Sequence, residues 1–298
     1  MKILVSGSSG LVGTKLTSLL TAEGHDVTAL VRRQAGSAEI RWDPAAGELD
    51  ASALEGFDGV VHLAGENIAA GRWTAAKKQR IRDSRVDSTR LLCQTLAGLE
   101  QRPAVLVNAS AIGYYGDRGD QQLAEDSPAG DGFLPDVCQA WEASTQPAAD
   151  EGIRVVRLRI GVVLSVDGGA LQKMLLPFRL GAGGKVGSGG QYWSWISIDD
   201  LVGVIHHALM TESLSGAVNA VAPQPVTNLQ FTKTLGRVLG RPTIFPMPAF
   251  AARLALGEMA NDLLLASARV VPAKLNESGY AFRHPDLESA LRRVLARS

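Results

Sequence analysis

The sequence has few cysteines, no excess of charge of either sign, and no long apolar run. Its two cysteines, Cys93 and Cys138, have no metal-ligand spacing, so a disulfide framework and a metal site are disfavoured. Lys+Arg 30 balance Asp+Glu 30, which predicts neither nucleic-acid binding nor a membrane partner. No run approaches the roughly 20 apolar residues that span a bilayer, and the N-terminus lacks signal-peptide architecture. We expect a cytoplasmic protein.

The length of 298 residues suits a large α/β protein with a substantial core. Apolar runs of strand length alternate with helical segments, which predicts a Rossmann-type doubly wound parallel sheet with a smaller C-terminal α/β lobe. We expect residues 1–165 to form the nucleotide domain, with 191–222 returning to it. Residues 166–190 and 223–298 are then the lobe.

The first thirteen residues, MKILVSGSSGLVG, organise this prediction. A short apolar strand runs into glycines at positions 7, 10 and 13, and a helical segment follows. Such a turn aims backbone N–H groups and the positive end of a helix dipole at one point, where a pyrophosphate can approach closely. The alternative is a plain glycine turn. The predicted cofactor contacts here are Gly7, Ser9, Gly10, Leu11 and Val12.

The end of the second predicted strand, Val27 to Val31, indicates which dinucleotide fits. An acidic residue at this position would bind the ribose 2′-hydroxyl of NAD, whereas arginine accommodates a 2′-phosphate. The sequence has Arg32 and Arg33 here and no acid, which favours NADP(H). The alternative is that both arginines are solvated charges.

A third buried strand, Val60 to Leu63, ends at the same predicted edge of the sheet. Its exit predicts further cofactor contacts and a pocket residue, Asn67, while His62 is interpreted as structural. The helical region that follows is basic, and one of its arginines could reach a phosphate. The predicted contacts from these segments are Leu63, Ala64, Gly65, Glu66 and Arg85.

The next strand, Ala104 to Val107, runs into small residues and then paired tyrosines. Ala109 is a predicted cofactor contact. Ser110, Tyr114 and Tyr115 are the candidate catalytic residues, because their hydroxyls would lie near a bound nicotinamide.

Two later features concern the substrate. The glycine-rich segment 181–190 predicts a lid or connection, and Lys185 within it could meet an anionic substrate. Trp193 is either a pocket wall or part of the core. Asp199 and Asp200 suit the N-terminus of the next helix as cap and dipole partner rather than as metal ligands.

Four segments together resemble the extended branch of the short-chain dehydrogenase/reductase superfamily: the glycine turn, HLAGEN, NASAIGYYGD and GSGGQYWSWISIDDL. A narrower likeness is to atypical, sugar-nucleotide-epimerase-like proteins of the YfcH kind. It rests on GENIAAGRW, IRDSRVDSTRLL, MLLPFRLGAGGKVGSG and the tail LGEMANDLLLASARVVPAKLNESGYAFRHPDLESAL. The resemblance implies an NADP-type cofactor held by the glycine loop, the arginine after the second strand, Leu63-Ala64 and Arg85.

The sequence departs from the superfamily at its catalytic positions. The resemblance implies a Tyr-x-x-x-Lys pair, yet Leu134 and Cys138 stand at these positions when the helix is aligned on Glu142. The usual serine or threonine position is Ala111, and the position of the arginine that binds a sugar nucleotide is Trp193. Two functions stay open: an NADP(H)-dependent oxidoreductase or epimerase-like enzyme on an unidentified small molecule, and a catalytically degenerate NADP(H)-sensing regulatory or scaffold protein. We expect a monomer or a homodimer.

Overall fold

The computed structural model describes residues 1–296, and its centre is an eight-stranded sheet in the order β12-β8-β6-β5-β1-β2-β3-β4. All neighbouring pairs are parallel except β3 and β4. This order and direction confirm the predicted doubly wound α/β fold. The strands are β1 (Lys2–Ser6), β2 (Asp26–Val31), β3 (Glu39–Asp43), β4 (Glu48–Leu49), β5 (Gly59–His62), β6 (Val105–Ala111), β8 (Arg154–Ile160) and β12 (Gly216–Ala220).

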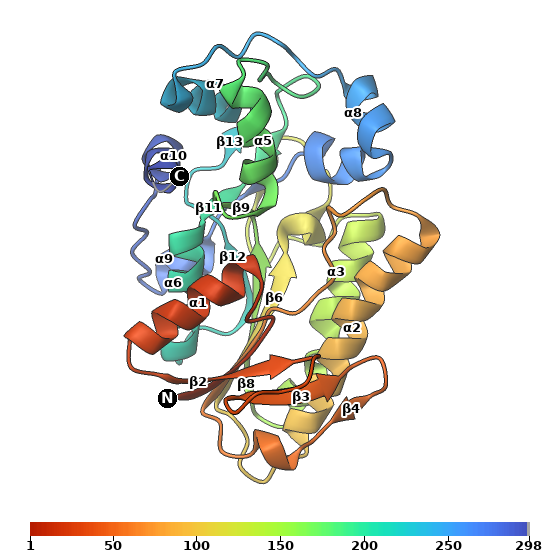
Figure 1. The fold of residues 1–298 in the computed structure, drawn as a ribbon, viewed down its shortest axis with the longest axis vertical. Helices are drawn as coiled ribbons and strands as arrows, with labels where there is room; N and C mark the ends of the chain where they lie inside the picture. The colour runs from red at the N-terminus through yellow and green to blue at the C-terminus, as the bar shows by residue number, and fades with distance from the viewer. Residues whose placement is uncertain (297–298) are drawn as a thin grey trace.

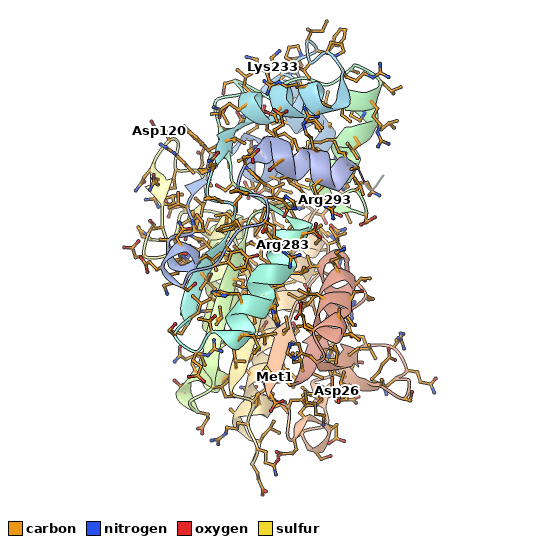
Figure 2. The ribbon with its side chains drawn as sticks, turned by 90° about the vertical axis from the view of Figure 1, so that its left-hand side faces the viewer. Met1, Asp26, Asp120, Lys233, Arg283 and Arg293 are labelled. Carbon is orange, nitrogen blue, oxygen red and sulfur yellow. The ribbon has the colours of Figure 1, made fainter. Side chains whose placement is uncertain are left out.

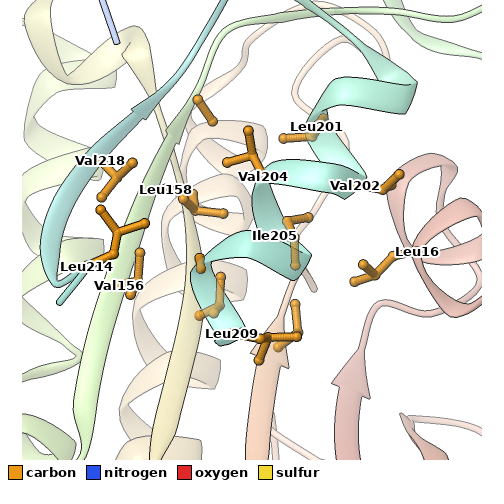
Figure 3. Close-up of a cluster of buried hydrophobic side chains, with 14 of the residues drawn as sticks. Leu16, Val156, Leu158, Leu201, Val202, Val204, Ile205, Leu209, Leu214 and Val218 are labelled. Atoms are coloured by element: carbon orange, nitrogen blue, oxygen red, sulfur yellow. The ribbon is translucent and has the colours of Figure 1, made fainter. Parts of the chain in front are cut away.

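Helices cover both faces of this sheet (Figure 1). On one face, α1 (Leu11–Ala22) and α6 (Ile198–Met210) bury an apolar cluster against β1, β6, β8 and β12. Figure 3 shows Leu16, Leu158 and Ile205 within it. The other face is covered by α2 (Ala75–Ala97), α3 (Phe133–Ala143) and α4 (Gln146–Asp150). The central strands β1, β5 and β6 are buried on both faces, and their sequences contain the apolar runs ILV, VV and VLV.

A smaller lobe lies beyond the carboxyl ends of the strands (Figure 1). Its core joins three helices to short strands around Trp195 and Phe231. The helices are α5 (Gly169–Arg179), α7 (Asn228–Leu239), α8 (Ala249–Leu256) and α10 (Leu287–Leu295), of which α5, α7 and α10 form that core. The short strands are β9 (Val162–Leu164), β10 (Tyr192–Trp193), β11 (Trp195–Ser197) and β13 (Val226–Thr227). The remaining elements are β7 (Gln122–Leu123), β14 (Arg269–Val270), α9 (Ala273–Glu277), the short 3-10 helices Ser52–Leu54 and Ile112–Tyr115, and the short π-helix Asn261–Leu265.

The C-terminal segment does not lie wholly with the lobe. Leu275 belongs to the apolar cluster under α6, and Tyr280 packs against the same cluster. The Tyr280 hydroxyl donates to the Asp200 carbonyl at 3.0 Å, and a Cβ on Gly203 would lie 2.5 Å from that hydroxyl. Glycine at position 203 therefore lets Tyr280 approach the helix.

Asp200 is buried at the start of α6, where it holds this segment. Its carboxylate accepts the backbone N–H groups of Arg283 at 2.7 Å and His284 at 3.1 Å. The helix cap itself is Ser197, whose hydroxyl accepts the Asp200 N–H at 3.0 Å. The predicted place of Asp200 at the helix N-terminus is right, but its role as the cap is wrong.

No helix within residues 1–296 is long and apolar enough to cross a membrane. The same residues hold no group of three or more His, Cys, Asp or Glu side chains that could bind a metal ion.

Candidate functional site

The glycine turn brings three backbone segments into close contact. Gly7 has a φ of +70°, and a Cβ there would lie 2.9 Å from the Ala64 nitrogen. A Cβ on Gly13 would lie 2.1 Å from the Gly7 carbonyl oxygen. A side chain at either position would therefore displace main chain, so the turn needs glycine to let α1 and the β5 exit approach it.

The N-terminus of α1 is open to an anion. Gly10 caps the helix without a side-chain hydrogen bond, and the first turn holds no acidic residue. The first N–H groups of a helix have no intrahelical acceptor, so those of Leu11 and Val12 and the dipole face outward together. Ser9 lies exposed in the same turn. This donor set fits the pyrophosphate of a dinucleotide.

The two arginines after β2 differ in their surroundings. The guanidinium of Arg33 forms a two-pronged ion pair with Glu39, with its Nη1 at 2.7 Å from Oε2. This pairing lowers the pKa of Glu39 through the hydrogen bond from Arg33. Arg32 is exposed and has no hydrogen bond or ion pair within residues 1–296. Of these two arginines, Arg32 is the one whose guanidinium has no hydrogen-bonded partner in the described part of the chain.

Ser6 and His62 hold the exit of β5 from beneath. The Ser6 hydroxyl accepts the N–H groups of Leu63 at 3.2 Å and Ala64 at 3.3 Å, and lies 2.6 Å from His62 Nδ1. His62 is fully buried, and burial lowers its pKa to about 4. A neutral imidazole between Ser6 and Ser88 acts as a structural residue, as the sequence indicates.

Arg85 lies under the turn that follows β5. Its two Nη atoms donate to the carbonyls of Ile81 and Glu66, each at 3.0 Å. Its guanidinium also stacks over Trp141 at 5.2 Å, and burial lowers its pKa. These contacts make Arg85 a support for the backbone at Gly65 and Glu66, with one N–H of each Nη group donating to a carbonyl.

The loop after Gly65 is held by its own contacts. The Glu66 carboxylate pairs with Lys77 at 2.6 Å, and this hydrogen bond lowers the pKa of Glu66. Asn67 is exposed, and its Oδ1 accepts the Ala69 N–H at 2.9 Å. The amide nitrogen of Asn67 remains available for a ligand.

Beneath the end of β6 lies a buried ion pair that the sequence did not predict. Arg159 of β8 binds Glu142 of α3 through Nε at 2.8 Å and Nη2 at 2.9 Å. Ser110 donates to the same carboxylate at 2.7 Å. All three side chains are buried. The hydroxyl of Ser110 is thus committed to Glu142, and Ala109 beside it is buried in the strand.

Tyr115 belongs to the same network. Its hydroxyl lies 2.7 Å from Asn219 Oδ1 and 3.0 Å from the Ala124 carbonyl, and it accepts from Arg159 Nη1 at 2.9 Å. The side chain has no exposed surface, and burial raises its pKa to about 12. A proton-transfer role for Tyr115 at a substrate does not fit this geometry.

Tyr114 is placed differently. Its ring lies over the Arg159 guanidinium at 3.4 Å and meets Tyr115 edge-on at 5.3 Å. The side chain is half-buried, and its hydroxyl has no hydrogen-bond partner among the described residues. Of the three predicted catalytic side chains, Tyr114 is the one with a free hydroxyl.

Helix α3 presents Leu134 and Cys138 to the exit of β6. A Cβ on Gly113 would lie 3.3 Å from Leu134 Cβ and 3.8 Å from Cys138 Sγ. Burial raises the pKa of Cys138 to about 12, so its thiol stays protonated. The two positions that the resemblance gives to tyrosine and lysine therefore supply no phenol and no ammonium group here.

The predicted substrate residues Lys185 and Trp193 belong to the lobe. Lys185 Nζ donates to the Ser188 carbonyl at 3.1 Å, and the loop is pinned to the chain at Met247 by backbone bonds of 2.8 and 2.9 Å. The glycine-rich segment 181–190 is thus a connection held by backbone hydrogen bonds rather than an unattached lid. Trp193 is 7% exposed and packs at a tilt against Phe231, with the ring centroids 5.4 Å apart, and its indole N–H has no acceptor among the described residues.

Comparisons with known proteins place the chain among one group of relatives. Residues 3–220 match the NAD dependent epimerase/dehydratase family, and residues 247–294 match a domain of unknown function. The chain is 45% identical over 290 residues to the epimerase family protein Mb2239 of Mycobacterium bovis, covering 97% of this chain and 96% of the relative. It is 40% identical to the human epimerase family protein SDR39U1, covering 99% and 100%.

Solved structures agree with this placement. The crystal structure of human SDR39U1 with NADPH superposes with a TM-score of 0.92 at 37% identity, covering all of both chains. The UDP-N-acetylglucosamine 4-epimerase from Bacillus cereus has a TM-score of 0.78 at 18% identity, covering 100% of this chain and 99% of the other. At that identity the second likeness concerns the fold alone.

Proposed function

The chain belongs to the NAD-dependent epimerase/dehydratase family, and we propose that it binds NADP(H) and transfers hydride to or from an unidentified small molecule. The observation that carries the cofactor is the open α1 N-terminus beside an uncommitted Arg32. The human relative solved with NADPH supports the same cofactor. When bound, the nicotinamide supplies the hydride donor or acceptor.

In this proposal different residues of the chain bind different parts of the cofactor. The N–H groups of Leu11 and Val12 hold the pyrophosphate, and Arg32 pairs with the 2′-phosphate. Leu63, Ala64 and Gly65 line the cofactor with backbone, while Glu66 and Arg85 fix the turn that carries them. Arg33 stays with Glu39 and contributes little to the phosphate.

Tyr114 is the proposed proton donor to the substrate oxygen. Its ring rests on the Arg159 cation, and Glu142 and Ser110 fix that guanidinium from the other side. Arg159, Glu142 and Ser110 are thus positioning residues. In this proposal Tyr114 takes the part of the tyrosine in the superfamily's Tyr-x-x-x-Lys pair, whose two positions hold Leu134 and Cys138 here.

The test is NADPH oxidation against a panel of aldehydes, ketones and quinones. We expect Tyr114→Phe to lower kcat about 10²-fold or more on an accepted substrate, since a positioned acid contributes that much, and to leave NADPH affinity unchanged. Tyr192→Phe, another half-buried tyrosine, is the matched control and should keep full activity. Unchanged turnover in Tyr114→Phe would remove Tyr114 from the mechanism.

The second candidate function is an NADP(H)-sensing regulatory or scaffold protein. It is favoured by Leu134 and Cys138 at the β6 exit and by the committed hydroxyls of Ser110 and Tyr115. A sensor would oxidise NADPH with no member of the panel, while NADPH would change hydrogen exchange in the lobe. Turnover with any panel carbonyl would exclude it.

A further inference from the structure

The lobe carries most of the exposed large apolar side chains of the described chain. Ten such side chains are exposed within residues 1–296, and eight of them lie in segments 168–190 and 223–256. We call these eight the apolar tip: Leu176, Leu180, Leu229, Ile244, Phe245, Met247, Phe250 and Leu254. Single exposed apolar residues are ordinary, but a gathering of this size indicates a binding surface.

The apolar tip is held together by contacts between its segments. The N–H of Phe245 donates to the Gly183 carbonyl at 3.4 Å, and that of Gly187 donates to the Met247 carbonyl at 2.9 Å. The connection from α7 to α8 thereby lies along the loop after α5, and it crosses the end of the molecule in Figure 1. Phe250 and Leu254 are 72% and 75% exposed and share one face of α8.

The same two segments are strongly basic. Although the whole chain has no net charge, segments 168–190 and 223–256 contain no Asp or Glu at all. Their basic residues are Lys173, Arg179, Lys185, Lys233, Arg237, Arg241 and Arg253. All are exposed except Lys185, which is half-buried. Figure 2 shows Lys233 at the end of the molecule away from Met1.

The acidic groups that border this surface are mostly paired or partly buried, and one of them, Glu288, offsets the charge of Arg237. Glu258 pairs with Lys78 on α2, and Glu288 pairs with Arg237 and Arg292. Asp262 is half-buried, and burial raises its pKa. Lys233 and Arg241 have no carboxylate partner within residues 1–296. The two segments that carry the apolar tip therefore hold excess positive charge.

We propose that the apolar tip docks on the surface of an anionic lipid bilayer. Exposed Phe, Leu, Ile and Met side chains beside lysine and arginine match the requirements of interfacial binding: apolar groups enter the headgroup boundary while cations pair with anionic lipids. A second copy of the chain is a poor occupant because it would bring an equally basic surface into contact. The zero net charge of the whole chain does not reveal this basic surface, because the acidic residues that balance it lie in the nucleotide domain and the C-terminal segment.

The experiment is sedimentation of the full-length protein with large unilamellar vesicles. We expect binding to phosphatidylcholine vesicles that contain 30% phosphatidylglycerol, and at least tenfold weaker binding to pure phosphatidylcholine. Binding should weaken as NaCl rises from 0.05 to 0.5 M, because screening removes the lipid attraction. The double variants Phe250→Asp/Leu254→Asp and Lys233→Glu/Arg241→Glu should each lose at least tenfold in binding.

Matched controls separate this surface from general effects. Met210→Asp changes an exposed apolar residue at the end of α6, and Arg41→Glu reverses an exposed charge on β3; both should bind vesicles as the unchanged protein does. NADPH titration of every variant checks that it has folded. Absence of sedimentation with anionic vesicles would overturn the proposal. Equal binding to both vesicle types would also overturn it, as would a dimer that Phe250→Asp/Leu254→Asp dissociates without vesicle binding.

Discussion

Arg159 and Glu142 face each other beneath the end of β6 and are joined by two hydrogen bonds of 2.8 and 2.9 Å. The pair links β8 to α3, and it also holds Ser110 and both tyrosines of the β6 exit. Both side chains are nearly inaccessible, so neither charge can recover its hydration if the other is removed. The pair therefore holds in place the β6 exit, where Tyr114 is the proposed proton donor.

Glu142→Gln should lower the free energy of unfolding by about 3–5 kcal/mol, because it leaves the Arg159 cation buried without a counter-charge. Asp87→Asn is the matched control: it breaks the exposed pair with Arg90, which is worth about 0–1 kcal/mol. Urea denaturation measures both. Equal losses in the two variants would contradict a special role for the buried pair.

Gly13→Ala should destabilise the fold by about 1–3 kcal/mol and weaken NADPH binding, since the new methyl group would press on the Gly7 carbonyl and distort the turn. Gly98→Ala makes the same change at the end of α2, where the Cβ meets only an ordinary contact of 3.6 Å, and should cost little. Thermal unfolding with and without NADPH separates the two effects. A Gly13→Ala protein with full affinity would mean that the turn is not the cradle.

Stability should fall as the solution is acidified from pH 7.5 to 5. His62 has a pKa of about 4 when folded and about 6.5 when unfolded, so the unfolded chain binds the extra proton first. The expected loss from this group by pH 5 is about 2 kcal/mol. The pKa values of His25 and His207 are also lowered by burial and act in the same direction. His62→Gln should reduce the slope measured by urea denaturation, and an unchanged slope would contradict the assignment.

The sequence predicted the fold and the glycine turn after β1 well because both rest on local patterns. Glycines spaced three apart between a strand and a helix can be read directly from the chain. The buried pair of Glu142 and Arg159 could not be predicted in this way, because the residues are distant in sequence and meet only when β8 packs beside α3. The sequence contained one indication of Arg159: it alternates with apolar residues in a predicted strand, as Arg157 does.

The difference between Arg32 and Arg33 also lay outside a local pattern. Adjacent arginines look equivalent in the sequence, yet Glu39 on the next strand binds one of them. The connection from β2 to β3 folds back so that this carboxylate accepts from Arg33 and also from the Gly36 N–H. The lobe was the hardest part to predict, since its pinned glycine-rich loop depends on backbone bonds to a segment about sixty residues away.

The most direct test of the account is calorimetric titration of the protein with NADPH and NADH. The unchanged protein should prefer NADPH, and Arg32→Ala should lose about 1.5–3 kcal/mol, or roughly ten- to a hundredfold, of NADPH affinity alone, because its charge-assisted bonds to the 2′-phosphate are gone. Arg33→Ala is the matched control and should bind NADPH nearly as tightly as the unchanged protein. Equal affinity for NADPH and NADH, or equal losses in Arg32→Ala and Arg33→Ala, would contradict the claim that Arg32 binds the 2′-phosphate.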